Sequence, residues 1–156
     1  MPTATGPVVP AFKAALLAGL RARALVEAQQ VQVEMLWPGP ATCPEGIYLG
    51  GFDDPPLAGR LTPGNMTASA THLDEVVEVP IVVQTWDAAP SVDADPEPRV
   101  FELFGELVAE LRENKTVSDS VQWSSSIAYV VSTFPAENGG WASRLVATVT
   151  VHARIT

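Results

Sequence analysis

The sequence predicts an α+β domain with a mainly antiparallel β-sheet and two helices packed on one of its faces. Two segments, near 10–28 and 99–114, carry apolar residues at helical spacing. Other segments alternate apolar and polar residues at the period of a strand. Few of these strands are joined through a helix, which favours antiparallel pairing. The expected order along the chain is α-β-β-β-β-α-β-β.

The first predicted helix begins at Pro10, because proline is tolerated in the first turn of a helix. It should end near 28–30, where the apolar period changes from 3.6 to 2. Residues 1–9 are expected to form a flexible N-terminal arm, and residues 10–156 a single domain. The apolar stripe of this helix consists of Phe12, Leu16, Leu20 and Ala24.

Two short strands are predicted next, around Val33 and around Tyr48. The connection between them contains Trp37-Pro38-Gly39-Pro40, in which the prolines fix backbone dihedrals and the glycine allows a tight reversal. We interpret this connection as architecture that sets the angle between the two strands. The polar, proline-rich stretch 53–65 that follows is expected to be a loop.

The long segment 66–86 alternates or runs apolar over its length and is predicted to be extended, with a buried face. That face would carry Val77, Val79, Ile81 and Val83. Pro80 lies within the segment and has no N–H to donate, so it is expected to mark a sheet edge or a bulge.

An acidic loop at 87–98 leads into the most clearly amphipathic helix, at about 99–114. Two late strands, 120–134 and 143–155, are predicted to form a hairpin, because Asn138-Gly139-Gly140 between them is a turn signal. The glutamates expected on the solvated face of the helix are Glu102, Glu106, Glu110 and Glu113.

The composition excludes several classes of protein. Eighteen acidic and nine basic residues give a formal charge of −9, which does not favour binding to nucleic-acid phosphates. The single cysteine, Cys43, excludes an internal disulfide and a cysteine-based metal cluster. The apolar run at 14–20 is too short to span a bilayer, and basic residues follow it instead of preceding it, so we expect no export signal and no membrane association.

Candidate reactive groups do not form a recognisable catalytic motif. His72, Asp74 and Glu75 are the most reactive-looking cluster, but no nucleophile or second ligand lies near them in the sequence. Asp93 and Asp95 alternate as calcium ligands do, yet the stretch lacks the glycine and the distant glutamate of an EF-hand loop. We therefore expect no enzymatic activity, no cofactor and no metal.

The layout of the chain resembles that of the tail terminator (tail completion) proteins of long-tailed bacteriophages. The resemblance covers residues 10–155 and depends on the order and spacing of several segments. An N-terminal helix runs into "LWPGP" and "GIYLGG", and the strand "EVVEVPIVVQTW" follows. An acidic loop then leads to the helix "RVFELFGELVAELRE", and "RLVATVTVHARI" closes the chain.

This resemblance implies a structural virion protein that forms a homo-hexameric ring on the last ring of tail-tube protein. Such a ring stops tube polymerisation and presents the surface that joins the head–tail connector or stopper protein. DNA passes through its lumen without specific binding. The implied location is the tail–neck junction of the virion, after assembly in the host cytoplasm.

Six residues are candidates for contacts between subunits or with the tail and neck. Aromatic side chains at strand ends are enriched at interface hot spots, although any of them can instead cap the core of its own chain. Proline-rich acidic loops cost less entropy to order at an interface than flexible ones. The candidates are Trp37, Phe52, Trp86, Asp93, Asp95 and Trp141.

Two alternatives remain open from the sequence. The first is a neighbouring neck component, a head–tail adaptor or stopper, which has a similar size and α/β make-up. The second is a small α+β ligand-binding or hydrolytic domain with His72, Asp74 and Glu75 at a pocket mouth.

Overall fold

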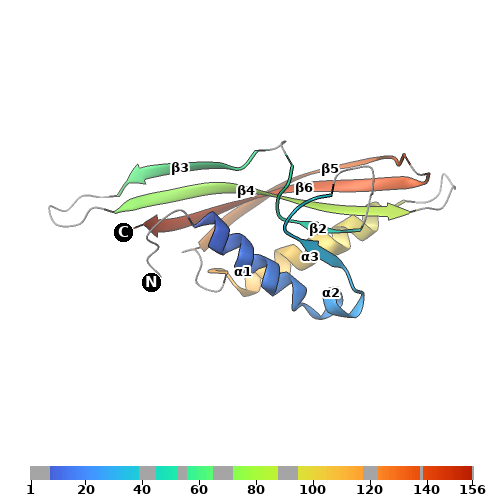
Figure 1. Cartoon of the computed structure of the whole chain (residues 1–156), viewed down its shortest axis with the longest axis horizontal. Coiled ribbons are helices and arrows are strands. Elements are labelled where there is room, and N and C mark those ends of the chain that lie inside the picture. Colours follow the sequence, from blue (N-terminus) through green and yellow to red (C-terminus); the bar gives the residue numbers. More distant parts are fainter. Residues whose placement is uncertain are drawn as a thin grey trace.

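Six strands form one sheet in the computed structural model, and the helices lie on one face of it (Figure 1). The structure describes residues 8–38, 45–52, 56–64, 72–87, 95–117, 123–137 and 139–155. This arrangement confirms the predicted α+β class. The elements are α1 (Val9–Arg21), α2 (Ala24–Ala28), β1 (Gln32–Glu34), β2 (Gly46–Tyr48), β3 (Ala58–Pro63), β4 (Leu73–Asp87), α3 (Glu97–Glu113), β5 (Trp123–Pro135) and β6 (Trp141–Ile155).

Strands β4 and β6 form the centre of the sheet. They pair antiparallel over their full 15 residues, from Leu73 opposite Ile155 to Asp87 opposite Trp141. On the other side of β6, β5 completes the predicted hairpin. On the other side of β4, β3 and β2 pair with different parts of the strand, and β1 adds to β2. The strands extend past the helical layer at both ends (Figure 1).

The core lies between this sheet and the helices α1 and α3. The predicted alternation in β4 is confirmed, because Val77, Val79, Ile81 and Val83 are all buried in one cluster. Burying an aliphatic side chain of this size contributes roughly 1.5–3 kcal/mol. No helix in the described part of the chain is long and apolar enough to cross a membrane. The helices contribute Phe12, Leu16, Leu20, Val100, Leu103, Phe104, Leu107 and Leu111.

The N-terminal helix is interrupted, contrary to the sequence prediction. Arg23 lies in an extended conformation between α1 and α2, with φ −68° and ψ 138°. Its guanidinium donates to Glu106 at 2.5 Å and to Glu110 and Glu113 at 3.1 Å, all on α3. These hydrogen bonds, chiefly the one to Glu106, raise the pKa of Arg23 above its ordinary value. The contact of Arg23 with α3, more than 80 residues away in the sequence, therefore stabilises the break between α1 and α2. The helical spacing of the apolar residues around Arg23 does not reveal this break.

Glu110 is the residue of α3 that departs most from its expected position. The helical pattern placed it on the solvated face, but it is only 9% exposed. Its carboxylate lies beneath Arg23 and directly against Gly19 of α1, where a Cβ would overlap it. The absence of a side chain at Gly19 thus lets α1 and α3 pack closely around this ion pair.

The stretch 53–65 was predicted to be a loop, and this prediction was wrong, because it contains β3. Every residue of β3 is exposed, so the strand carries no pattern of buried and exposed positions that the sequence could reveal. Pro80 is buried in β4. It lies between the part of β4 that pairs with β3, which ends at Glu78, and the part that pairs with β2, which begins at Val82. At Pro80, β4 therefore pairs with β6 on one side and with no strand on the other, so the predicted edge is a short gap beside a central strand.

Strands β1 and β2 run parallel, so the connection between them is not a tight reversal. Parallel neighbours need a crossover of roughly a dozen residues, and residues 35–45 supply it. Trp37 and Pro38 are described, whereas Gly39 and Pro40 lie outside the described residues. The interpretation of this segment as architecture stays a prediction for those two positions.

Replacing Arg23 with Met is expected to reduce the free energy of unfolding by about 2 kcal/mol, because it leaves largely buried carboxylates without their cation. Arg21→Met is the matched control. Arg21 also pairs with a glutamate, Glu34, but both side chains are about half exposed, so its loss should cost less than about 1 kcal/mol. Urea denaturation followed by circular dichroism measures both. Equal losses for the two variants would contradict the structural role of Arg23.

Candidate interaction surfaces

Trp37 and Phe52 lie together on the face of the sheet opposite the helices. Their ring centroids are 6.4 Å apart with an interplanar angle of 72°, an edge-to-face arrangement. Trp37 also donates from Nε1 to Oε1 of Gln84, at 3.3 Å, and Gln84 is fully buried in β4. Both rings are half-buried. Part of each predicted interface residue therefore packs within its own chain.

Arg144 on β6 joins this group and was not singled out from the sequence. It is paired in register with Gln84 of β4, and its guanidinium lies 5.5 Å from the ring centroid of Trp37 and 5.9 Å from that of Phe134. Arg144 Nε and Gln84 Nε2 are buried and have no acceptor in the described part of the chain. Only the strand register brings these residues together, so no local sequence signal could have identified them.

Trp86 and Trp141 lie at the end of the sheet where β4 stops and the β5–β6 hairpin turns. Asp87 is paired with Trp141, and Trp86 is paired with Ala142. The indole Nε1 of Trp86 donates to the carbonyl of Gly139 at 2.8 Å, which fixes the hairpin turn against β4. Both tryptophans are half-buried.

Of the two candidate aspartates, only Asp95 is described. Its side chain is exposed, and Oδ1 accepts the backbone N–H of Glu97 at 3.0 Å, at the start of α3. It therefore satisfies one of the free N–H groups at the helix N-terminus. Asp93 lies outside the described residues.

The reactive-looking cluster is divided between two faces of the sheet. His72 Nε2 is 3.9 Å from Asp74 Oδ1, and that oxygen also accepts from Arg154 Nε at 3.2 Å. Glu75 points to the opposite face, is buried, and accepts the backbone N–H of Val8 at 3.1 Å. The three groups do not converge on one pocket. Among the described residues, no group of three or more His, Cys, Asp and Glu side chains could hold a metal ion.

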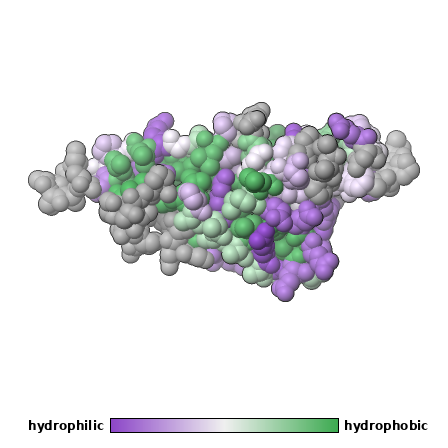
Figure 2. All heavy atoms as spheres, in the orientation of Figure 1, coloured by the Kyte–Doolittle hydropathy of each residue, from purple (hydrophilic) through white to green (hydrophobic). Residues whose placement is uncertain are grey.

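Exposed apolar side chains form two separate patches. The β3 patch consists of Leu57, Leu61 and Leu73. The β5 patch consists of Phe101 and Tyr129 on the helix side of the sheet and Val130 on its opposite face. Leu36, which follows β1, is also exposed and belongs to neither patch. The two patches lie on opposite sides of the β4–β6 pair. Figure 2 shows hydrophobic residues gathered over the end of the molecule that contains β3, and hydrophilic residues around α2.

The β5 patch is the more exposed of the two. Val130 is 73% exposed and Tyr129 is 52% exposed. Tyr129 packs edge-to-face against Phe101 of α3, with centroids 5.9 Å apart, so its ring is held in place while one side faces solvent. Exposed large apolar groups make this strand a candidate interaction surface.

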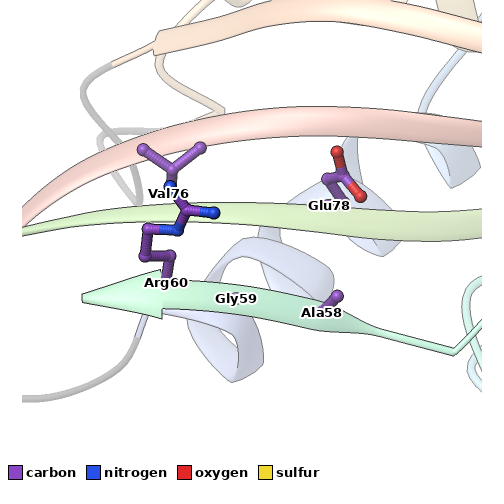
Figure 3. Close-up of a pocket in the computed structure, with 5 residues that line it drawn as sticks. All are labelled: Ala58, Gly59, Arg60, Val76 and Glu78. Carbon is purple, nitrogen blue, oxygen red and sulfur yellow. The ribbon is translucent and has the colours of Figure 1, made fainter. Parts of the chain in front are cut away.

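A shallow hollow lies between β3 and β4 (Figure 3). In this view Arg60 extends from β3 toward Val76 of β4, and Glu78 lies farther along β4. The hollow therefore offers one cation, one carboxylate and some aliphatic surface, which suits contact with another chain more than chemistry on a small molecule.

Comparisons with known proteins found similar chains among the solved structures. No protein-family model and no curated protein matches the chain. A chain from a solved structure, the virion of a native gene transfer agent (GTA) particle, aligns with it at a TM-score of 0.43 and 16% sequence identity. The alignment covers 91% of this chain and 93% of that chain. A likeness at this level does not assign a function.

Trp37→Phe is expected to reduce the free energy of unfolding by about 1–2 kcal/mol. It keeps an aromatic ring but removes the donor to Gln84, whose buried side-chain amide is then left without a partner. Trp86→Phe is the control. Its Nε1–H donates to the carbonyl of Gly139 in an exposed turn, where water can replace the lost donor. Thermal and chemical denaturation of both variants would check the difference, and a larger loss for Trp86→Phe would contradict it.

Proposed function

We propose that the chain is a phage tail terminator: a structural, non-enzymatic subunit of a hexameric ring that caps the tail tube, stops its polymerisation and joins the tail to the head connector. The layout of the sequence motivates this proposal. The structure adds one observation that supports ring formation in particular, the two different apolar patches on opposite sides of the central strands.

Two different patches favour a head-to-tail contact between copies. When a surface pairs with itself, association ends at a dimer. When one patch of each copy meets a different patch of the next, association continues until the rotation closes a ring. The β3 patch and the β5 patch are on different elements and have different side chains, so they meet this condition.

The charge of the chain is compatible with a DNA-conducting ring. Each copy carries a formal charge of −9, so six copies present a strongly acidic assembly. Tight binding of DNA requires cations that neutralise phosphates, and an acidic lumen lacks them. DNA would therefore pass through such a ring without adhering to its wall.

The proposed function predicts that the purified chain, mixed with its tail-tube protein, yields tubes capped at one end and halted in growth. Negative-stain electron microscopy of tube lengths measures this. Val130→Lys should abolish capping, because a charge on the exposed β5 patch opposes its burial between subunits. His72→Ala should cap as well as the unaltered chain, because no step of the proposed function uses the imidazole.

Three outcomes would contradict this assignment. Tubes that ignore a ring-forming chain would favour the head–tail adaptor or stopper role. Tubes that ignore a chain which stays monomeric would favour a small ligand-binding domain. Loss of capping in His72→Ala with an unchanged ring would show that the cluster around His72 has a function that this proposal omits.

A further inference from the structure

Strand β5 has an unusually unprotected edge. It is 13 residues long, it pairs with β6 on one side, and no described strand pairs with its other side. A free edge exposes a row of backbone N–H and C=O groups to any other strand. Stable monomers usually protect such an edge with charged side chains, prolines or bulges.

Strand β5 has little of this protection. Its sequence, WSSSIAYVVSTFP, contains no charged residue. Its one irregularity of register lies between Ser124 and Ser126, and its one proline, Pro135, is its last residue. The stretch 127–134 between them is a regular, uncharged edge that also carries the two most exposed apolar side chains of the β5 patch. This combination indicates that the edge is covered in the assembled protein.

Strand β3 is the matching edge on the other side of the sheet. It pairs with β4 along one side, no described strand pairs with its other side, and all its residues are exposed. It contains a single charged residue, Arg60. The β3 patch lies on and beside it, so this edge also exposes apolar surface.

The strand directions make the two edges compatible. Along the chain β3–β4–β6–β5 every neighbouring pair is antiparallel, so β5 runs in the direction of β4 and opposite to β3. If a second copy is placed beside the first in the same orientation, its β3 therefore runs antiparallel to β5 of the first. The antiparallel pattern of backbone hydrogen bonds can then continue from one copy to the next.

We propose that β5 of one copy pairs antiparallel with β3 of the next copy, so that a continuous sheet joins the subunits. This inference rests on the proposed ring and names its subunit contact. The occupant of the β5 edge is thus a second copy of this chain. Main-chain hydrogen bonds provide the pairing, and the two apolar patches provide the buried surface.

The two faces of the sheet exclude every second register, and among the remaining ones we propose the one that brings the exposed apolar groups together. Tyr129 lies on the helix side, because it is paired with buried Ala147, and Leu61 lies on the same side, because it is paired with buried Glu75. A one-residue shift would put every side chain on the wrong face. With Tyr129 opposite Leu61, the two partly exposed apolar groups cover each other, and Ser132 lies opposite Ala58 of the next copy.

Disulfide trapping tests this contact. Residues directly opposite each other in an antiparallel pair have Cα atoms about 4.5–5.5 Å apart, which a disulfide can span. Ala58→Cys and Ser132→Cys would be introduced together into a Cys43→Ser background, since both native side chains are small and exposed. Mild oxidation and a non-reducing gel should give a ladder of covalent oligomers whose longest member equals the ring size. Each single cysteine variant should remain at the size of one chain.

Other outcomes would overturn the contact. Dimers from Ser132→Cys alone would show that β5 pairs with β5 of a second copy. A double variant that caps tail tubes but forms no ladder would leave the proposed function intact and remove this contact. A ladder from a chain that does not halt tube growth would support the contact and remove the terminator function.

Discussion

The pairing of β4 with β6 is the interaction on which the rest of the structure depends. The two strands hold one register over 15 residue pairs, and every other strand except β1 is attached to one of them. Their buried side chains form the apolar face of the sheet against which α1 and α3 pack. Their opposite face supports Gln84 and Arg144 beneath the ring of Trp37. A change in this register would alter the core and the outer face together, because side chains alternate between the two faces.

Two long-range polar contacts then position the remaining elements. Arg23 holds the junction of α1 and α2 against α3 through three carboxylates, and it does so in a partly buried setting where losing the cation is costly. Arg99 ties the start of α3 to Glu45, just before β2, at 2.6 Å. The Arg23 contacts thus join the helices to each other, and the Arg99 contact adds a charge interaction between α3 and the start of β2 to the apolar packing of the core.

The strands β3 and β5 carry the contact surfaces that we propose for this fold. The described reactive groups are spread over the sheet: His72 and Asp74 lie on one face, and Glu75 is bound to the start of α1 on the other. Apart from Leu36, the exposed large apolar side chains of the described residues lie on or beside two unpaired edges, β3 and β5. This distribution supports the proposal that the chain assembles with copies of itself. The tryptophans expected at interfaces are half-buried within the chain, so they can support the shape of a contact surface while being only partly available to it.

The sequence by itself determined the elements that bury a face. The alternation around Val79, the stripe containing Leu16 and the helical spacing of α3 each reflect burial against the core, and burial imposes a period. It did not determine β3, which is exposed at every position, or the break at Arg23, which depends on glutamates of a distant helix. Nor did it identify Arg144, which meets Trp37 and Phe134 only through strand register. Local sequence patterns indicate which face of a helix or strand is buried. Tertiary structure alone decides which distant residues are in contact and which strand edges remain unpaired.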